Sequence, residues 1–565
     1  MPSNLIKVAK EQLREKILES IGVCITSERL PTQPVKNFTI EIPSNILFGD
    51  LATNVAMVCS KSFKMPPLQI AQIIAENINL EDTYFDSYNI VSPGFINFFF
   101  KQCWFKDVLT NIDISKQDYG KSNIGKNQKV MVEFVSANPT GPMHMGNARG
   151  GALGDCLASV LELCGYDVIR EFYINDAGNQ IEKFGSSLEA RYLQIFKGDE
   201  ISFPEDGYHG DDIKDLAELF AKIYKDEFVE KSSEDRKKAL VDFALPKNIS
   251  KIKEDLKEYR IEYDVWFKES TLYKNKDVDK VIELLKNNNC VYEKEGAIWY
   301  KATSHGSKKD EVLIRANGFP TYFATDIAYH YNKFINRKFN KVINIWGADH
   351  HGHVERLKDA LQDIGIDSSK LDIILMQLVR LTKNGNVVRM SKRTGKSITL
   401  TDLLEEVPID AARFFFNMRE ANSHLDFDLG LAVEQSSQNP VYYVQYAYAR
   451  ICSVLSKAKY KEEFVYENKV SDDDFICETS EEKELVKILS LYPDVVEEAS
   501  KTYDSSSITK YSLSLAAAFH KFYNSCKVVS EDERITNIRL LVCSCTKIVL
   551  KNVLSLIKID APEKM

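Results

Sequence analysis

The spacing of apolar residues divides the first part of the chain into short alternating elements. From Leu5 to Ile21 apolar residues recur at helical spacing, and the segments "FTIEI" and "PGFINFFF" are strand-like runs. The polar stretch "SKQDYGKSNIGKNQ" follows and has the composition of a linker. This pattern predicts a compact α/β domain over residues 1–115.

A second pattern begins near residue 120. The apolar run "KVMVEFVSA" predicts a buried strand, which is followed by a glycine- and proline-rich loop, a helix and the strand "DVIREFYI". A strand, a helix and a strand in such close succession indicate a parallel sheet. We expect a parallel α/β domain over 120–435, with a charged and mostly helical insertion at about 195–300. The segments "KVINIWGAD" and "LDIILMQLVRL" then resume the sheet.

The last part of the chain has helical periodicity throughout. The segments "VYYVQYAYARICSVL" and "TKIVLKNVLSLI" both repeat their apolar residues at the helical period. We therefore expect an all-α domain over 436–565. The predicted fold class is multidomain, with an α/β N-terminal domain, a parallel α/β domain that carries an insertion, and an all-α C-terminal domain.

Composition and charge narrow the class of protein. The chain has 565 residues, of which 44% are hydrophobic and 27% charged, as in folded globular proteins. Its net charge of −9 gives no global positive field, so a nucleic acid would have to meet local basic patches such as "NRKFNK", "SKAKYK" and "SKRTGK". The 11 cysteines are scattered, which favours reduced, buried thiols. The charged N-terminus lacks a signal peptide's apolar core, and no apolar run approaches the roughly 18 residues of a membrane span, so we expect a cytoplasmic protein without a membrane partner.

Two loops carry candidate phosphate chemistry. Residues 137–151, "ANPTGPMHMGNARGG", form a turn-rich segment that leads into a helix, and unpaired N–H groups at helix N-termini bind phosphates well. Residues 389–396, "RMSKRTGK", form a basic loop that could neutralise a polyphosphate leaving group. Each has a plainer alternative, namely a helix start with an ordinary histidine and a solvated basic loop. The P-loop and dinucleotide-binding glycine patterns are absent.

Together these loops resemble the HIGH and KMSKS signatures of class I aminoacyl-tRNA synthetases. The segments "EFVSANPTGPMHMGNARGGALGD", "YINDAGNQI", "GFPTYFATDIAYHYNK", "WGADHHGHVERL" and "NPVYYVQYAYARI" further resemble, in this order, the arginyl-tRNA synthetase family. The resemblance implies a Rossmann-like catalytic domain and ATP, bound with Mg²⁺, as a substrate. It also implies that L-arginine is activated to arginyl-adenylate and transferred to the 3′ end of tRNA(Arg), by a protein that is monomeric as in most of the family.

The resemblance assigns the ATP site residue by residue. His144, Asn147 and Lys392 would be catalytic, and Lys392 would act on the departing pyrophosphate. The full set of expected ATP-binding residues is His144, Gly146, Asn147, Gly347, Asp349, Met390, Ser391 and Lys392. The chain departs from the signatures in having Asn147 at the final histidine of HIGH, and Arg389 and Arg393 at the first lysine and final serine of KMSKS.

The amino-acid pocket is expected to hold carboxylates, because a guanidinium is a planar fork of donors that keeps its charge. Glu133 and Asp326 match family positions that hold the substrate, and Tyr322 would share the helix face of Asp326. Ser136 and Asn138 match positions near the backbone end of the arginine. Taken alone, Glu133 could equally be a structural carboxylate at a strand end.

The run "DHHGH" at 349–353 contains three histidines and an aspartate, which invites a metal-site interpretation. On a strand, neighbouring side chains point to opposite faces and could not share one ion. We therefore expect no protein-bound metal here, and expect His350 or His351 to face the nucleotide instead.

The tRNA surface is predicted from aromatic residues and from the resemblance. Tyr442, Tyr443, Tyr446 and Tyr448 could stack on anticodon bases, although they could equally be core residues. In the family the helical domain grips the anticodon arm, which puts Tyr446 and the C-terminal Met565 near tRNA. Phe95 and Asn97, in "SPGFIN", resemble residues that meet the D-loop.

Two other functions fit parts of the pattern. A non-catalytic tRNA- or partner-binding relative would keep the fold, but it would not need His144, Lys392, Glu133 and Asp326 together. Another nucleotidyltransferase of the superfamily would have no obvious use for the C-terminal helical domain. The sequence therefore favours an active arginyl-tRNA synthetase.

Overall fold

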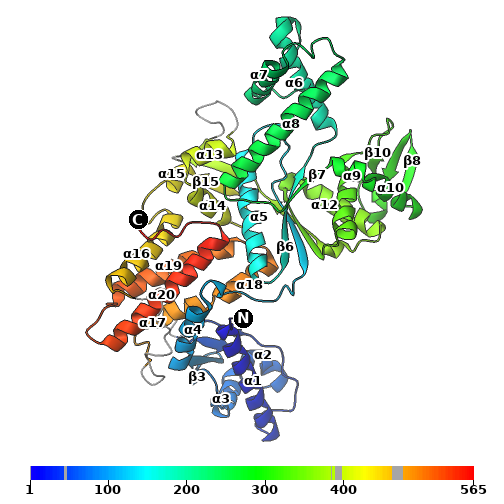
Figure 1. Cartoon of the computed structure of the whole chain (residues 1–565). Helices are drawn as coiled ribbons and strands as arrows, with labels where there is room; N and C mark the ends of the chain where they lie inside the picture. Colours follow the sequence, from blue (N-terminus) through cyan, green and yellow to red (C-terminus); the bar gives the residue numbers. More distant parts are fainter. Residues whose placement is uncertain (1, 44–47, 384, 389–397, 461–474) are drawn as a thin grey trace.

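The structure is a computed structural model that describes residues 2–43, 48–383, 385–388, 398–460 and 475–565. A small N-terminal domain lies against a bundle of C-terminal helices, and a larger α/β domain with two excursions lies on the other side of that bundle (Figure 1). Among the described residues, no helix is long and apolar enough to cross a membrane.

The N-terminal domain is a four-stranded antiparallel sheet with helices packed against it. The strands stand in the order β1-β2-β4-β3, so β4 is central and pairs with β2 and β3. The elements are α1 (Leu5–Thr26), β1 (Ile40–Glu41), β2 (Leu51–Thr53), α2 (Val55–Phe63), α3 (Pro67–Glu76), β3 (Phe85–Val91), β4 (Phe95–Phe100) and α4 (Gln102–Ser115).

The sheet of the larger α/β domain is fully parallel and has the order β12-β11-β5-β6-β7. Its strands are β5 (Lys129–Glu133), β6 (Asp167–Ile174), β7 (Val265–Lys268), β11 (Lys341–Gly347) and β12 (Leu371–Met376). Strand β5 comes first in the chain but lies in the middle, with β6 on one side and β11 on the other. Such a reversal of strand order opens a crevice at the carboxyl ends of the strands, which is where ligands bind in open α/β sheets.

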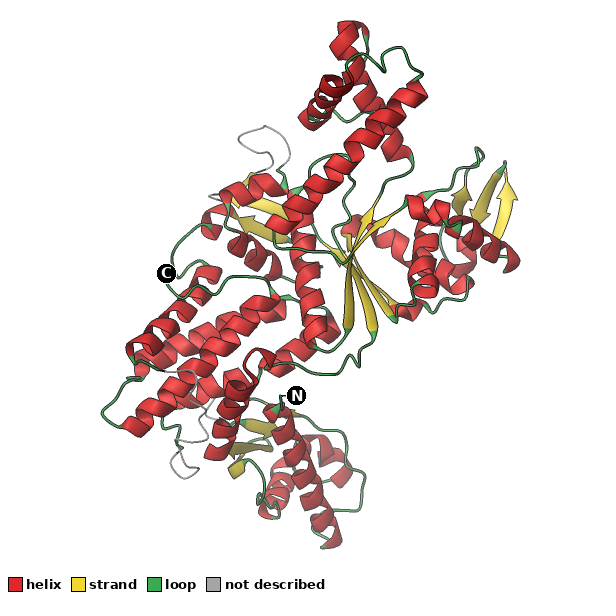
Figure 2. Cartoon of the chain, viewed as in Figure 1, coloured by secondary structure: helices red, strands yellow, loops and turns green. Residues whose placement is uncertain are grey.

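Two excursions interrupt this sheet. The first contains α6 (Asn179–Lys197), α7 (Asp211–Tyr224) and α8 (Ser233–Glu258); it has its own core around Phe184, Tyr192 and Phe220 and projects away from the sheet (Figure 1). The second contains α9 (Ser270–Lys274), α10 (Asp277–Asn287), β8 (Val291–Lys294), β9 (Ala297–Tyr300), β10 (Glu311–Ile314), α11 (Tyr322–Tyr331) and a π-helix (Asn332–Asn336). Strands β8 to β10 form a separate antiparallel sheet, visible in Figure 2.

Between the two excursions, β7 pairs with β6 inside the stretch that the sequence analysis treated as a single insertion. The pattern did not reveal this strand because it is only four residues long and lies between charged helices. The single expected strand "LDIILMQLVRL" is also divided, into β12 and β13 (Val379–Lys383).

A small mixed sheet follows, in the order β14-β13-β15. Its strands and the surrounding helices are α12 (His351–Asp363), β13, β14 (Asn386–Val388), α13 (Leu400–Glu406), α14 (Ile409–Asn417), β15 (Leu425–Asp428) and α15 (Leu429–Ala432).

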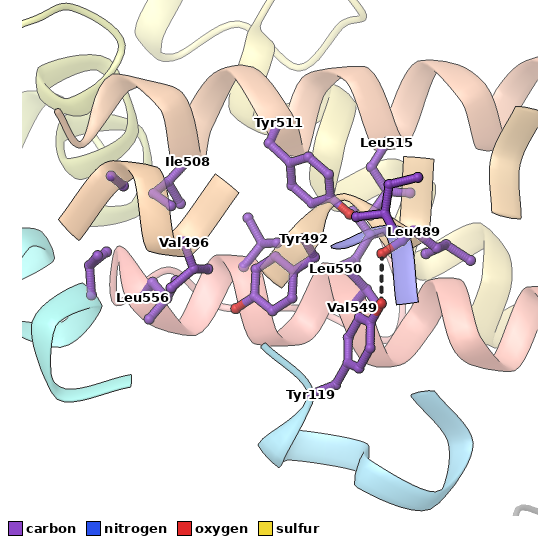
Figure 3. Packing of buried hydrophobic residues seen from close by; sticks show 14 of the residues in the cluster. Tyr119, Leu489, Tyr492, Val496, Ile508, Tyr511, Leu515, Val549, Leu550 and Leu556 are labelled. Atoms are coloured by element: carbon purple, nitrogen blue, oxygen red, sulfur yellow. Dashed lines mark hydrogen bonds between the residues drawn. The ribbon is translucent and has the colours of Figure 1, made fainter. Parts of the chain in front are cut away.

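The C-terminal domain is all-helical in its described part. Its helices are α16 (Pro440–Lys457), α17 (Ser480–Ser490), α18 (Tyr492–Thr502), α19 (Ser506–Ser525) and α20 (Glu533–Leu556). Tyr119, from the linker after the N-terminal domain, points into these helices, and its hydroxyl donates to the carbonyl of Leu489 over 3.2 Å (Figure 3). One continuous apolar core therefore joins the N-terminal domain, the long helix α5 (Met145–Leu163) and the C-terminal helices.

Candidate active site

The residues that follow the basic loop pair with the turn-rich loop at the start of α5. The backbone of His144 forms an antiparallel bridge with that of Thr399. The Met145 N–H donates to the Ile398 carbonyl over 3.0 Å, and the Leu400 N–H donates to the Met143 carbonyl over 2.9 Å. The chain therefore leaves the basic loop beside the N-terminus of α5. The loop residues Met390, Ser391 and Lys392, with Arg389 and Arg393, lie outside the described residues.

The start of α5 has the character of an anion site. His144 is the N-cap residue and is exposed, and its N–H donates to the Asn147 side-chain oxygen over 3.1 Å. Asn147 thus caps the helix with its oxygen, a task that an amide performs as well as any other acceptor. Gly146 is exposed, and a Cβ atom at this position would meet no protein atom within 4 Å. A ligand can therefore approach the helix backbone closely here.

Two other glycines of the same stretch serve packing instead. A Cβ atom on Gly154 would lie 2.2 Å from the ring of Phe134, and one on Gly151 would lie 2.7 Å from Ile261. These glycines let α5 lie tightly against the end of β5. The concentration of small residues thus has two causes, one at the ligand face and one at the helix–sheet contact.

A cavity of about 720 Å³ opens beside this helix start. It lies between the start of α5 and the small sheet of β13, β14 and β15. Its lining residues are His144, Met145, Gly146, Leu378, Val379, Arg380, Leu381, Val387, Val388, Ile398, His424, Leu425 and Asp426. The cavity is large enough for a nucleotide-sized ligand.

The backbone is strained directly after β5. Val135 and Ser136 both have positive φ, 69° and 43°, and a β-branched residue such as valine rarely adopts this conformation. Strain of this kind costs on the order of 1–3 kcal/mol per residue and concentrates at functional sites. It turns the chain sharply at the central strand of the sheet and brings the Ser136 hydroxyl back to Glu133, to which it donates over 3.1 Å.

Helix α11 carries a row of polar side chains on one face. Tyr322, Asp326 and His330 follow at four-residue spacing, and Lys333 continues the row in the π-helix. Burial increases along it, from Tyr322 at 48% exposed to His330 at 1% and Lys333 at 0%. Asp326 lies toward the exposed end of this row, and His353 Nε2 lies 2.8 Å from one of its carboxylate oxygens.

Glu133, which was expected to hold the substrate, already has two partners. Lys333 Nζ donates to its Oε2 over 2.5 Å, and Ser136 donates to its Oε1. The side chain is buried at the end of β5. Glu133 therefore faces the site as half of an ion pair and not as a free carboxylate.

A carboxylate that the sequence analysis missed lies close enough to Asp326 for their charges to interact. Glu269 directly follows β7 and is 2% exposed, and the Tyr273 hydroxyl donates to it over 3.0 Å. In the amide orientation that satisfies its neighbours, Asn175 also donates to Glu269, over 2.8 Å. Burial raises the pKa of Glu269 to about 7, and the charges of Asp326 and Asp176 add to the shift. No local pattern marks this residue, because its strand was not recognised.

The "DHHGH" run does not lie on a strand. It covers a short 3₁₀ helix after β11 and the first turn of α12, so the alternation argument made for it was wrong. Asp349 and His350 are exposed, with His350 Nε2 3.8 Å from an Asp349 carboxylate oxygen, while His353 pairs with Asp326 instead. No group of three or more His, Cys, Asp or Glu side chains within the described ranges is arranged to hold a metal ion. Gly347, at the end of β11, lies at the same edge of the sheet as Glu133.

Comparisons with known proteins agree with this geometry along the whole chain. Residues 8–100 match the "Arginyl tRNA synthetase N terminal domain", residues 108–436 the "tRNA synthetases class I (R), catalytic domain", and residues 444–565 the "DALR anticodon binding domain". The chain belongs to the arginyl-tRNA synthetase family. The predicted family and the predicted multidomain fold class are thereby confirmed, as is the prediction that the chain is an enzyme of the aminoacyl-tRNA ligase type. Class I membership implies ATP as a substrate.

Individual members of the arginyl-tRNA synthetase family are similar to this chain in sequence over their whole length. The arginine–tRNA ligase of Acetivibrio thermocellus is 52% identical over 564 residues, and that of Ruminiclostridium cellulolyticum is 53% identical over 563; each match covers 100% of both chains. A putative arginyl-tRNA synthetase structure from Campylobacter jejuni is 34% identical, with a TM-score of 0.74 over 82% of this chain and 100% of that one. The Thermus thermophilus arginyl-tRNA synthetase, at 21% identity and a TM-score of 0.73, covers 98% of this chain and 100% of its own and supports the fold.

The tRNA candidates of this family member differ in accessibility. Tyr446 is 38% exposed and lies parallel to Tyr442, with ring centroids 6.2 Å apart, whereas Tyr448 is buried in the core. Tyr443 packs against His520. Of the remaining candidates, Phe95 and Met565 are exposed, but Asn97 is only 2% exposed on the central strand β4. Asn97 therefore does not present its side chain to a partner in this structure.

Proposed function

We propose that the chain activates L-arginine with ATP and Mg²⁺ and transfers the arginyl group to the 3′ end of tRNA(Arg). In the first step an arginine carboxylate oxygen bonds to the α-phosphorus of ATP, and the bond from that phosphorus to the β-bridging oxygen breaks, which releases pyrophosphate. In the second step the terminal ribose hydroxyl of tRNA attacks the carbonyl carbon, and AMP leaves. The observation that supports this most strongly is a pair of carboxylates close enough to interact: Glu269, which directly follows β7, and Asp326 on α11.

For arginine, the proposal gives the guanidinium to Asp326 and Glu269. A planar fork of five donors suits two carboxylates, and the charge of Glu269 acts on both Asp326 and Tyr322, which share one face of α11. Ser136 and Asn138, which follow the strained turn after β5, would face the ammonium end. Glu133 would act there through its hydrogen bond from Ser136.

For ATP, His144, Gly146 and Asn147 would line the triphosphate at the N-terminus of α5, where the helix dipole favours negative charge. Gly347 and Asp349, at the end of β11, would receive the ribose and adenine. Met390, Ser391 and Lys392 are proposed from the sequence signature, with Lys392 neutralising the leaving pyrophosphate.

For tRNA, the proposal places the anticodon arm on the C-terminal helices. Tyr446 offers an exposed ring, and the Arg450 guanidinium lies 5.3 Å from its centroid, a combination suited to stacked bases. Phe95 would meet the outer corner of the tRNA, and Met565 would lie near the anticodon. We also propose a cytoplasmic, monomeric protein.

The decisive experiment is arginine-dependent exchange of pyrophosphate into ATP, measured with and without tRNA(Arg), followed by arginine transfer to the tRNA. Citrulline is the matched control, because it has nearly the shape of arginine but carries no side-chain charge. We expect exchange with arginine and none with citrulline. Exchange with both would contradict the carboxylate pocket. Tight tRNA binding without any exchange would instead indicate a non-catalytic tRNA-binding protein.

A further inference from the structure

Lys333 is a fully buried cation with no access to solvent. Its Nζ donates to Glu133 Oε2 over 2.5 Å and to Asn344 Oδ1 over 3.1 Å, and it lies 4.0 Å from the ring centroid of Tyr329. Burying an ion pair is costly, and such a pair gives little stability over apolar residues of the same size. A buried lysine in this position therefore needs an explanation other than stability.

The position of Lys333 in the fold suggests one. It lies in the π-helix that continues α11. It is the most buried member of the row of polar side chains whose exposed end carries Tyr322 and Asp326. Single π-turns are rare and occur frequently at functional sites. The same helix thus presents the proposed guanidinium ligand at one end and this buried cation at the other.

A chain of hydrogen bonds connects Lys333 to Asp326. Asn344, whose oxygen accepts from Lys333, donates through its amide to His330 Nε2 over 2.8 Å. His330 Nδ1 then donates to the backbone carbonyl of Asp326 over 2.8 Å. Burial, with the nearby charge of Lys333, holds the pKa of His330 well below its usual range. The ring is therefore neutral, with one donor and one acceptor, as these two bonds require.

A second branch connects Lys333 to the strained turn. Through Glu133 it reaches Ser136, whose hydroxyl oxygen in turn accepts from the Tyr173 N–H over 3.2 Å. Lys333 therefore stands at the junction of two branches, one to the carboxylate end of the proposed pocket and one to its ammonium end.

We propose that Lys333 is a positioning residue for arginine: it neutralises Glu133 and fixes Ser136 and Asp326, so that Asp326 and Glu269 alone are left to pair with the guanidinium. The inference rests on the proposed function. Without this cation, Glu133 becomes a third, mobile carboxylate beside the pocket, and both ends of the substrate lose their fixed partners. Loss of Lys333 should weaken the binding of arginine and leave the binding of ATP unchanged, because the hydrogen-bond network ends at the proposed arginine site.

The test uses the full-length protein and pyrophosphate exchange. Lys333→Met should raise the KM for arginine at least about 10-fold and leave the KM for ATP within about twofold. Lys280→Met is the matched control, because Lys280 is an exposed lysine that contacts the neighbouring Tyr331 and takes no part in the network; its arginine KM should equal that of the wild type. Arginine titration calorimetry should report the same changes in affinity without relying on turnover.

A double variant separates positioning from folding. Lys333→Met leaves Glu133 buried and unpaired, whereas Lys333→Met combined with Glu133→Gln removes both charges and should recover the melting temperature. If Lys333 positions the substrate, the double variant keeps a raised KM for arginine although it is stable. A folded variant of either kind with wild-type arginine KM and affinity would overturn the proposal. Absence of arginine-dependent exchange in the wild type would instead contradict the proposed function itself.

Discussion

His144 and Thr399, which come from opposite halves of the chain, pair through their backbones at the N-terminus of α5. This bridge places the residues that follow the basic loop at a helix start where unpaired N–H groups favour phosphate. The cations of the loop itself remain a prediction from the sequence for the same site. The first two predictions concern this site.

Lys392→Ala should slow arginyl-adenylate formation roughly 100-fold or more, because preorganised charge at a leaving group contributes about that much. The arginine KM should change little. Pre-steady-state adenylate formation measures the step. Lys383→Ala is the control, since Lys383 ends β13 with a partly exposed side chain and pairs with Glu406. If the variant kept wild-type turnover, the charge of the leaving pyrophosphate would have to be neutralised by Arg389 or Arg393 instead.

Asn147 should prove to have two separable roles. Asn147→Leu removes the acceptor for the His144 N–H and should cost about 1 kcal/mol of stability in addition to activity. Asn147→Asp keeps the acceptor and the stability, but its negative charge near the triphosphate should slow activation by roughly 10-fold or more, since like charges at short range cost on the order of 1–4 kcal/mol. Thermal melts and exchange assays on both variants test this, and equal losses of stability would show that the hydrogen bond is not a cap.

Glu269 should make arginine binding depend on pH near neutrality. Its pKa of about 7 means that much of the free protein carries a protonated, neutral carboxyl at pH 6. A guanidinium favours the ionised form, so arginine affinity should rise as the pH increases through 7 and then level off, with release of a proton on binding. Calorimetry in buffers of different ionisation enthalpy detects that proton. Glu269→Gln should weaken binding and flatten the profile; a profile that keeps its slope would assign the titration to another group.

Asp155→Asn should be strongly destabilising. Asp155, on α5, receives a 2.5 Å hydrogen bond from fully buried Arg413, which also donates to the carbonyls of Ile557 and Tyr259. Removing the carboxylate leaves a buried charge without its partner and should cost about 3–5 kcal/mol. Denaturant unfolding measures the loss. Glu19→Gln, which breaks the exposed pair with Lys16, should cost less than about 1 kcal/mol and serves as the comparison.

Tyr446→Ala should weaken tRNA binding by about 1–3 kcal/mol, the usual contribution of one stacked base. Arginine-dependent kinetics at saturating tRNA should stay close to those of the wild type. Filter binding of tRNA(Arg) measures the effect. Tyr224→Ala, at an equally exposed tyrosine of the first excursion, is the control. Equal losses in both variants would show that surface aromatic area in general, and not this helix face, contributes to binding.

Local pattern in the sequence was enough to predict the elements around the candidate site. Strand β5, the turn after it and the start of α5 follow one another directly, so apolar spacing and turn residues sufficed to mark this loop as a candidate phosphate site. The individual roles of His144, Tyr322 and Asp326 came from the resemblance to the family and stay predictions. Figure 1 shows α5 beside β6 near the centre of the molecule.

What escaped prediction depends on contacts between distant segments. Glu269 follows a four-residue strand that is recognisable only by its pairing with β6. The partner of Glu133, Lys333, lies 200 positions away along the chain. The sequence does not show why Gly154 is a glycine, whereas the structure does, because a Cβ atom there would lie 2.2 Å from the ring of Phe134.

The central position of β5 in its sheet also affects the order in which the protein can fold during synthesis. A ribosome delivers β5 and β6 early, but the edge of β5 that pairs with β11 stays open until both excursions have emerged. Pairings between segments so far apart are slow to form and leave a strand edge exposed to aggregation in the meantime. The crevice at the carboxyl ends of the strands therefore forms only after β11 has paired with β5. Thr399 is synthesised later still, and only then can its backbone pair with that of His144.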